Sequence, residues 1–98
     1  MDYRELNDFE LVSYVRENSE EANELLYDKY KPLIEKNARR LLKYCNYNGL
    51  ELNDLIQEGM LGLSRAIDTF NDSKEASFYT YAKTCIERKQ LSAIISSQ

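Results

Sequence analysis

Apolar residues recur every three or four positions over most of this chain, and no stretch alternates strictly between apolar and polar residues. This spacing lines up side chains on one face of an α-helix and predicts an all-α fold. The pattern starts near residue 8, resumes after Asn18 and runs toward Cys45. It continues from about Leu52 to Phe70 and from Ser77 toward Ile95. We expect a compact helical bundle of about four to five helices.

Polar residues with capping preferences mark where these helices begin. Asn7 or Asp8 is a candidate N-cap for the first helix. Asn18 and Glu21 have the spacing of a capping box for the second helix. Ser77 is the predicted cap of the last helix.

Breaking residues predict where helices bend or stop. Pro32 cannot donate a backbone hydrogen bond, so it either kinks the second helix or starts a new one. Segment 46–49 predicts a helix stop in which Gly49 is left-handed, and segment 71–74 predicts a loop.

Composition is that of an ordinary soluble domain. Of the 98 residues, 43% are hydrophobic and 31% charged, with only three Gly and one Pro. No apolar run approaches the roughly 18 residues that span a bilayer. Residues 1–5 lack the apolar core of a signal peptide. We therefore predict a single cytoplasmic domain over residues 1–98.

The formal net charge of −4 is distributed unevenly. Residues 1–28 contain nine acids and two bases, whereas residues 29–98 contain eleven bases and eight acids. Local fields decide where a polyanion can dock, so this asymmetry matters more than the total charge. The basic excess is modest, and we expect no tight binding to duplex DNA by this chain alone.

Residues for catalysis or metal binding are scarce. The chain has no His, and Cys45 and Cys85 are its only cysteines, too few for a tetrahedral zinc site. It also lacks a CxxC spacing, a Gly-rich phosphate loop and a recognisable nucleophile motif. We expect buried or half-buried thiols, no metal, no cofactor, no catalytic residue and no enzymatic activity.

Segment 52–70 has an apolar side and a polar side. The predicted core stripe is Ile56, Met60, Leu63, Ile67 and Phe70. Gly59 and Gly62 lie beside it and indicate that another helix approaches closely. The polar side carries Asp54, Gln57, Glu58, Leu61, Ser64 and Asp68. A solvated face accounts for its charges, but a leucine among them is a candidate hot spot for a basic partner helix.

Segment 77–95 begins with an aromatic cluster beside cations. Aromatic residues at helical spacing commonly belong to a core, and Phe78 lies on the inward stripe with Ala82, Cys85 and Ile86. Tyr81, Thr84 and Arg88 share a second side, and Tyr79 and Lys83 a third. Tyrosines beside cations outside the core suit stacking with nucleobases, while the cations hold phosphates.

Segment 54–70 resembles a stretch of bacterial sigma factors. The match is Asp-Leu-Ile-Gln-Glu-Gly at 54–59, then Gly-Leu at 62–63 and Ala-Ile-Asp-Thr-Phe at 66–70. In that family this helix docks on the clamp-helix coiled coil of the largest RNA polymerase subunit. The resemblance implies that Asp54, Gln57, Glu58, Met60 and Ser64 contact core RNA polymerase, and geometry alone adds Leu61.

Segment 78–82, Phe-Tyr-Thr-Tyr-Ala, is similar to the promoter-melting segment of the same family. There, an aromatic residue at the place of Tyr81 stacks on the duplex edge that is left when the minus-ten adenine of the non-template strand flips out. The resemblance implies that Glu87, Arg88 and Gln90 read the upstream edge of this element. Lysines at 74, 83 and 89 would contact phosphates. The complete predicted DNA-binding set is Lys74, Phe78, Tyr79, Tyr81, Lys83, Thr84, Glu87, Arg88, Lys89 and Gln90.

Departures from the family pattern indicate which type of sigma factor the chain resembles. Primary sigma factors have two tryptophans where this chain has Thr84 and Cys85, and a tyrosine in place of Ala76. With less stacking surface, spontaneous melting should be weaker and promoter choice more stringent, which implies an alternative sigma factor. Segment 84–90, Thr-Cys-Ile-Glu-Arg-Lys-Gln, looks most like the stationary-phase and sporulation branch of Gram-positive bacteria.

We expect a transcription initiation domain that binds core RNA polymerase and recognises and melts the minus-ten element of promoter DNA. An anti-sigma factor is a further implied partner, and we expect this chain to lack the downstream promoter-reading domains. The alternative function is a small helical protein-interaction adaptor without nucleic-acid binding.

Overall fold

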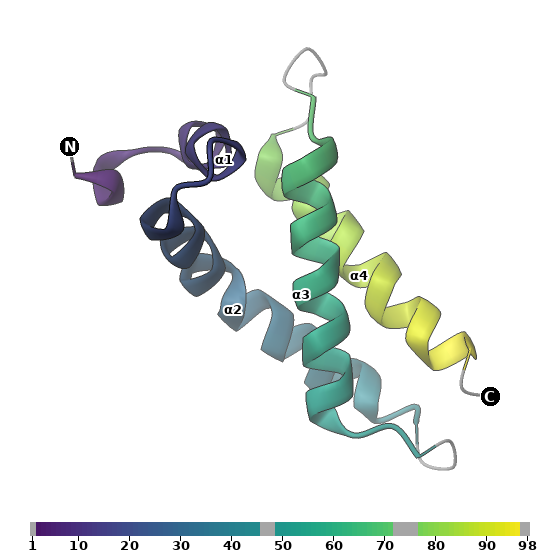
Figure 1. Ribbon diagram of the computed structural model, residues 1–98. Helices are drawn as coiled ribbons and strands as arrows, with labels where there is room; N and C mark the ends of the chain where they lie inside the picture. Colours follow the sequence, from purple (N-terminus) through teal and green to yellow (C-terminus); the bar gives the residue numbers. More distant parts are fainter. Residues whose placement is uncertain (1, 46–48, 72–76, 97–98) are drawn as a thin grey trace.

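The computed structural model describes residues 2–45, 49–71 and 77–96. The regular secondary structure in these ranges is all helical, as predicted, with no strand. They form a short 3₁₀ turn, η1 (Tyr3–Glu5), and the helices α1 (Asp8–Arg16), α2 (Glu20–Leu42), α3 (Leu52–Thr69) and α4 (Phe78–Ser96). The antiparallel pair α3 and α4 shares the largest interface, and α2 crosses it with α1 near one end (Figure 1). Within the described residues, none of the helices is long and apolar enough to span a membrane.

Polar side chains cap the N-terminal ends of both α1 and α2. Asn7 Oδ1 accepts a hydrogen bond from the Glu10 backbone N–H at 2.8 Å, and Glu10 closes a capping box. The predicted Asn18–Glu21 capping box is wrong by one residue, because Ser19 is the N-cap of α2. Asn18 instead adopts a left-handed φ of 69° just after α1, a conformation that Asn tolerates.

Of the residues predicted to break or cap helices, Gly49 and Ser77 lie between helices, whereas Pro32 lies inside one. Helix α2 continues through Pro32 without interruption, so this proline does not start a new helix. Gly49 is left-handed, with φ of 76°, as predicted. Ser77 Oγ accepts from the Thr80 backbone N–H at 3.2 Å and caps α4. Residues 46–48 of the predicted stop and residues 72–74 of the predicted loop lie outside the described residues.

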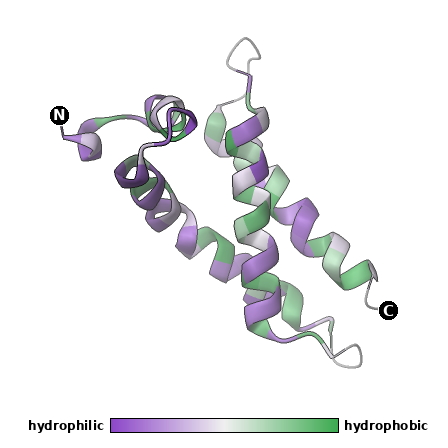
Figure 2. Cartoon of the chain, viewed as in Figure 1, coloured by the Kyte–Doolittle hydropathy of each residue, from purple (hydrophilic) through white to green (hydrophobic). Residues whose placement is uncertain are grey.

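The core lies where α2, α3 and α4 meet. Its largest fully buried side chains include Tyr30, Leu26 and Ile34 of α2, Leu63 of α3 and Ile86 of α4. Cys45 is buried and Cys85 half-buried, as predicted. The outer surface of α1 and the first turns of α2 are mostly hydrophilic (Figure 2). Met60 departs from the predicted core stripe, since its side chain is 37% exposed beside the gap between α3 and α2.

The two glycines of α3 allow the close helix approach that the sequence indicates. A Cβ atom at Gly62 would lie 2.7 Å from the Cys85 carbonyl oxygen and 2.8 Å from the Ile86 Cα. A Cβ at Gly59 would lie 2.7 Å from Gln90 Nε2 and from Ile34 Cγ2. Since backbone atoms cannot move aside, Gly62 sets the spacing between α3 and α4 and thus between the faces that they present.

Candidate functional site

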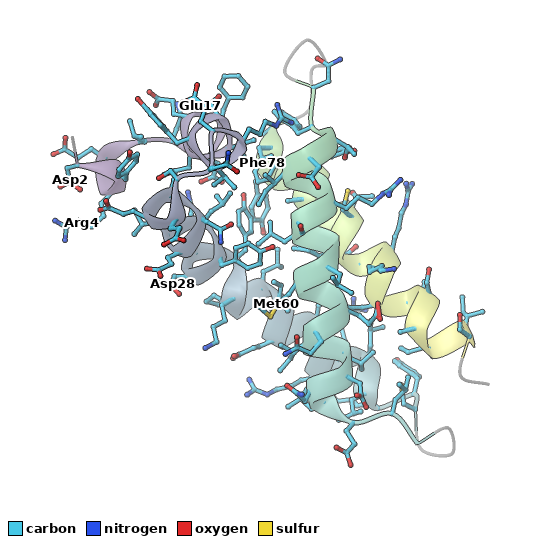
Figure 3. All side chains as sticks on the ribbon, in the orientation of Figure 1. Asp2, Arg4, Glu17, Asp28, Met60 and Phe78 are labelled. Atoms are coloured by element: carbon cyan, nitrogen blue, oxygen red, sulfur yellow. The ribbon has the colours of Figure 1, made fainter. Side chains whose placement is uncertain are left out.

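A groove of about 690 Å³ separates the first half of α2 from α3, and we call it the docking groove. Leu61 is 54% exposed and, with Met60, supplies its apolar surface. Glu24 and Asp28 place carboxylates on the α2 wall; Figure 3 labels Asp28 and Met60, one from each wall. The full lining is Asn23, Glu24, Tyr27, Asp28, Gln57, Met60, Leu61 and Ser64. An exposed apolar surface bordered by carboxylates suits a helix with apolar and basic side chains.

Four of the six predicted polymerase-binding residues line this groove: Gln57, Met60, Leu61 and Ser64. The structure separates the other two from it. Asp54 Oδ2 accepts from the Glu51 backbone N–H at 2.9 Å and so caps α3. Glu58 Oε2 lies 3.9 Å from Lys89 Nζ of α4. Glu58 and Lys89 were assigned to different partners by the sequence, yet they face each other across the α3–α4 interface.

A second groove separates the second half of α2 from α4, and we call it the basic groove. Its lining residues are Leu33, Lys36, Asn37, Arg40, Tyr79, Lys83 and Glu87. Lys36 and Arg40 from α2 face the same space as Lys83 from α4, against the carboxylate of Glu87. Cations beside an exposed ring are the combination that holds single-stranded nucleic acid, through phosphates and base stacking.

Tyr79 is 48% exposed and rests on a buried tyrosine. Its ring stacks on that of Tyr30, with centroids 6.1 Å apart and planes inclined by 25°. The Tyr30 hydroxyl donates to Asp8, which also pairs with Lys29. Burial, followed by the hydrogen bond to Asp8, raises the pKa of Tyr30 above its usual value and keeps the phenol neutral. Tyr79 therefore has a fixed, uncharged ring beneath it.

Tyr81 lies on another side of α4, next to the end of α3. Its ring is tilted by 49° against Phe70, with centroids 5.7 Å apart. Its hydroxyl lies 2.6 Å from Thr69 Oγ1. The structure thus confirms that the two tyrosines occupy different sides of the helix. Arg88 is exposed, and Thr84 is half-buried with its hydroxyl donating to the Thr80 carbonyl at 3.1 Å.

Two residues of the predicted DNA-binding set, Phe78 and Gln90, are buried in the core rather than exposed to a nucleic acid. Phe78 is 3% exposed and packs edge-on against Tyr30 and Phe70. Gln90 is fully buried: its Nε2 donates to the Leu55 carbonyl at 2.9 Å and the Ile34 carbonyl at 3.2 Å. Its Oε1 accepts from Asn37 Nδ2 at 2.6 Å. These partners satisfy the amide inside the core. Lys74 lies outside the described residues.

Sequence reasoning missed the contribution of α2 to both grooves. Glu24 and Asp28 on one groove, and Lys36 and Arg40 on the other, are pairs four residues apart on this helix. That spacing places each pair on one face, and the change from acid to base along the helix was a readable signal. No group of metal-binding side chains is found among the residues whose structure is described.

Comparison with known proteins identifies the family. A family model described as Sigma-70 region 2 matches residues 26–98. The chain belongs to the sigma-70 region 2 family. The matched range covers most of α2 and all of α3 and α4. It includes the whole basic groove and all of the docking groove except Asn23 and Glu24, while η1 and α1 precede it.

The relatives of this sigma-70 region 2 chain are named as RNA polymerase sigma factors. The RNA polymerase sigma-H factor of Bacillus subtilis is 31% identical over 90 residues, covering 92% of this chain and 39% of that protein. The sigma-C factor of a Nostoc species is 44% identical over 69 residues, covering 66% and 16%. The sigma factor SigA of Mycoplasma genitalium is 33% identical over 101 residues, covering 96% and 20%. The chain thus spans two fifths or less of the length of these relatives. No solved structure matches it.

Proposed function

We propose that this domain acts in transcription initiation, binding core RNA polymerase through α3 and capturing unpaired promoter DNA through α4. The observation that carries the proposal is the pair of grooves on either half of α2, one acidic and aliphatic, the other basic and aromatic. A protein helix and a nucleic-acid strand require these two different surfaces.

The proposed polymerase contact centres on Leu61 and Met60, with Gln57 and Ser64 beside them. A clamp helix carrying basic residues would bury the two apolar side chains and approach Glu24 and Asp28. Desolvated apolar residues at the centre of such an interface supply most of the affinity, and the surrounding charges steer association. Asp54 and Glu58 lie at the edge and contribute through their charge.

The proposed DNA contact uses binding energy rather than catalysis. Moving a base out of the duplex costs a few kcal/mol of unstacking. Stacking on an aromatic side chain returns about 1–3 kcal/mol per base, and Tyr79 and Tyr81 offer two such rings. Lys83, with Lys36 and Arg40, would hold the phosphates of the strand, while Arg88 would contact a base edge. Nothing in this exchange requires a catalytic group or a cofactor.

We further propose an alternative rather than a primary sigma factor, of the stationary-phase and sporulation type. Thr84 and Cys85 in place of two tryptophans, and the similarity to sigma-H factors of two Bacillus species, support this assignment. An anti-sigma factor covering the docking groove and action in the cytoplasm belong to the same proposal. No observation favours the adaptor function without nucleic acid.

A labelled single-stranded oligonucleotide with a minus-ten sequence tests the proposal in the presence of core RNA polymerase. The unaltered chain should retain the oligonucleotide, and Tyr81→Ala combined with Arg88→Ala should weaken retention by about tenfold or more. Tyr44→Ala combined with Arg39→Ala, on exposed residues at the end of α2, is the matched control. Equal retention by all three proteins would refute the DNA assignment and favour the adaptor function.

A further inference from the structure

Thr69, the last residue of α3, makes a side-chain contact with Tyr81 that the sequence did not suggest. Its hydroxyl donates to the Arg65 carbonyl at 2.7 Å, one helical turn earlier. A threonine hydroxyl has a single hydrogen. The 2.6 Å contact with Tyr81 is therefore a bond in which the tyrosine hydroxyl donates and Thr69 Oγ1 accepts.

The ring of Tyr81 is held at a second point by Phe70. Phe70 is itself buried and fixed by Phe78, with centroids 5.3 Å apart and planes at 88°, and by Phe9 at 6.2 Å. A tyrosine held by its hydroxyl and by one side of its ring cannot swing freely about its side-chain torsions. The end of α3 and the start of α4, which provide these groups, lie side by side (Figure 1).

We propose that Thr69 is a positioning residue that orients Tyr81 for stacking with an unpaired nucleobase. The inference rests on the proposed function and adds a residue of α3 to the DNA-binding apparatus of α4. A platform that is already ordered binds more tightly, because less rotamer freedom is lost when the base arrives. Loss of the Thr69 acceptor should weaken base capture by about three- to tenfold.

The experiment uses the full chain with core RNA polymerase and two single-stranded minus-ten probes. One probe is intact, and the other carries an abasic site in place of the minus-ten adenine, which is the unpaired base that this proposal assigns to Tyr81. Thr69→Val keeps a β-branched side chain and removes the acceptor, Thr69→Ser restores it, and Tyr81→Phe removes the donor but keeps the ring. Ser13→Ala is the control, since Ser13 Oγ donates to the Phe9 carbonyl one turn earlier on α1.

Thr69→Val and Tyr81→Phe should each weaken binding of the intact probe by about three- to tenfold. Their combination should be no worse than either variant alone. Thr69→Ser and Ser13→Ala should bind like the unaltered chain, and none of the variants should change binding of the abasic probe.

Thr69→Val that binds the intact probe normally, or that weakens both probes equally, would overturn the positioning role and leave the proposed function intact. If the unaltered chain does not distinguish the two probes, base capture at Tyr81 fails, and the positioning role fails with it. Thermal unfolding of each variant, monitored by circular dichroism, separates a loss of fold from a loss of base capture.

Discussion

The docking groove and the basic groove share α2 as a wall but differ in charge and in apolar chemistry. Glu24 and Asp28 face the first, and Lys36 and Arg40 face the second. Asp28 and Lys36 are eight residues apart, or about 12 Å along the helix axis. Ions screen charges over about 8 Å at physiological salt. One helix can therefore present two largely independent fields to two classes of partner.

The apolar side chains of the two grooves also suit two different classes of partner. Leu61 and Met60 offer flexible aliphatic surface, which suits burial under a protein helix. Tyr79 offers a flat ring supported by Tyr30, which suits a base. Gly62 lets α3 and α4 pack closely, and this packing sets the distance between the two surfaces. A test of the comparison should therefore change one activity and spare the other.

The largest effect is expected from Leu61→Arg, which replaces the exposed apolar centre of the docking groove with a cation. Affinity for core RNA polymerase should fall about thirtyfold, equivalent to about 2 kcal/mol. This affinity is measured by the fluorescence anisotropy of the labelled chain during titration with polymerase. Leu91→Arg is the matched control, because Leu91 of α4 is 47% exposed and lines neither groove. Equal losses for the two variants would show that charge alone, not the groove, governs binding.

An intermediate effect is expected from Tyr79→Ala, which removes the exposed ring of the basic groove. Binding of a single-stranded probe at saturating polymerase should weaken about tenfold, within the range for loss of one stacked base. Affinity for polymerase itself should not change. Tyr44→Ala, on an exposed tyrosine outside this groove, should have no effect on either measurement. A drop in polymerase affinity with Tyr79→Ala would show that the two grooves do not bind polymerase and DNA separately.

The smallest effect is expected from Lys36→Gln, which removes one cation of the basic groove. Probe affinity should fall about threefold at moderate salt, and the slope of log affinity against log salt should become shallower by about 0.7. Titrations at several salt concentrations measure this slope, with Lys43→Gln at the end of α2 as control. An unchanged slope would mean that the strand does not pass between α2 and α4.

Much of the fold was predictable because helix signals are local. Asn7 and Ser77 cap helices as predicted, and Gly49 is left-handed. The error at Asn18 arose because Asn both caps helices and tolerates the left-handed conformation that follows them. Local preference could not distinguish these two roles without the path of the chain from α1 into α2.

Less of the candidate site was predictable, and Gln90 shows why. An amide on a helix reads as a surface group, yet Gln90 is buried, since Asn37 and the carbonyls of Ile34 and Leu55 complete its hydrogen bonds. Those partners come from α2 and α3, far away in the sequence. Met60 is the converse case, an apolar residue of the inward stripe that is left exposed beside a groove.

The sequence by itself determined the helices, the family and the assignment of Tyr79 and Tyr81 to different sides of α4, because periodicity records angles around a single helix axis. Only the tertiary structure decided which residues of the other helices each side of α4 contacts. The acids and bases of α2 acquire their roles, and Thr69 reaches Tyr81, through the packing of helices against one another. Such contacts depend on spacings like that at Gly62, which no single-helix pattern contains.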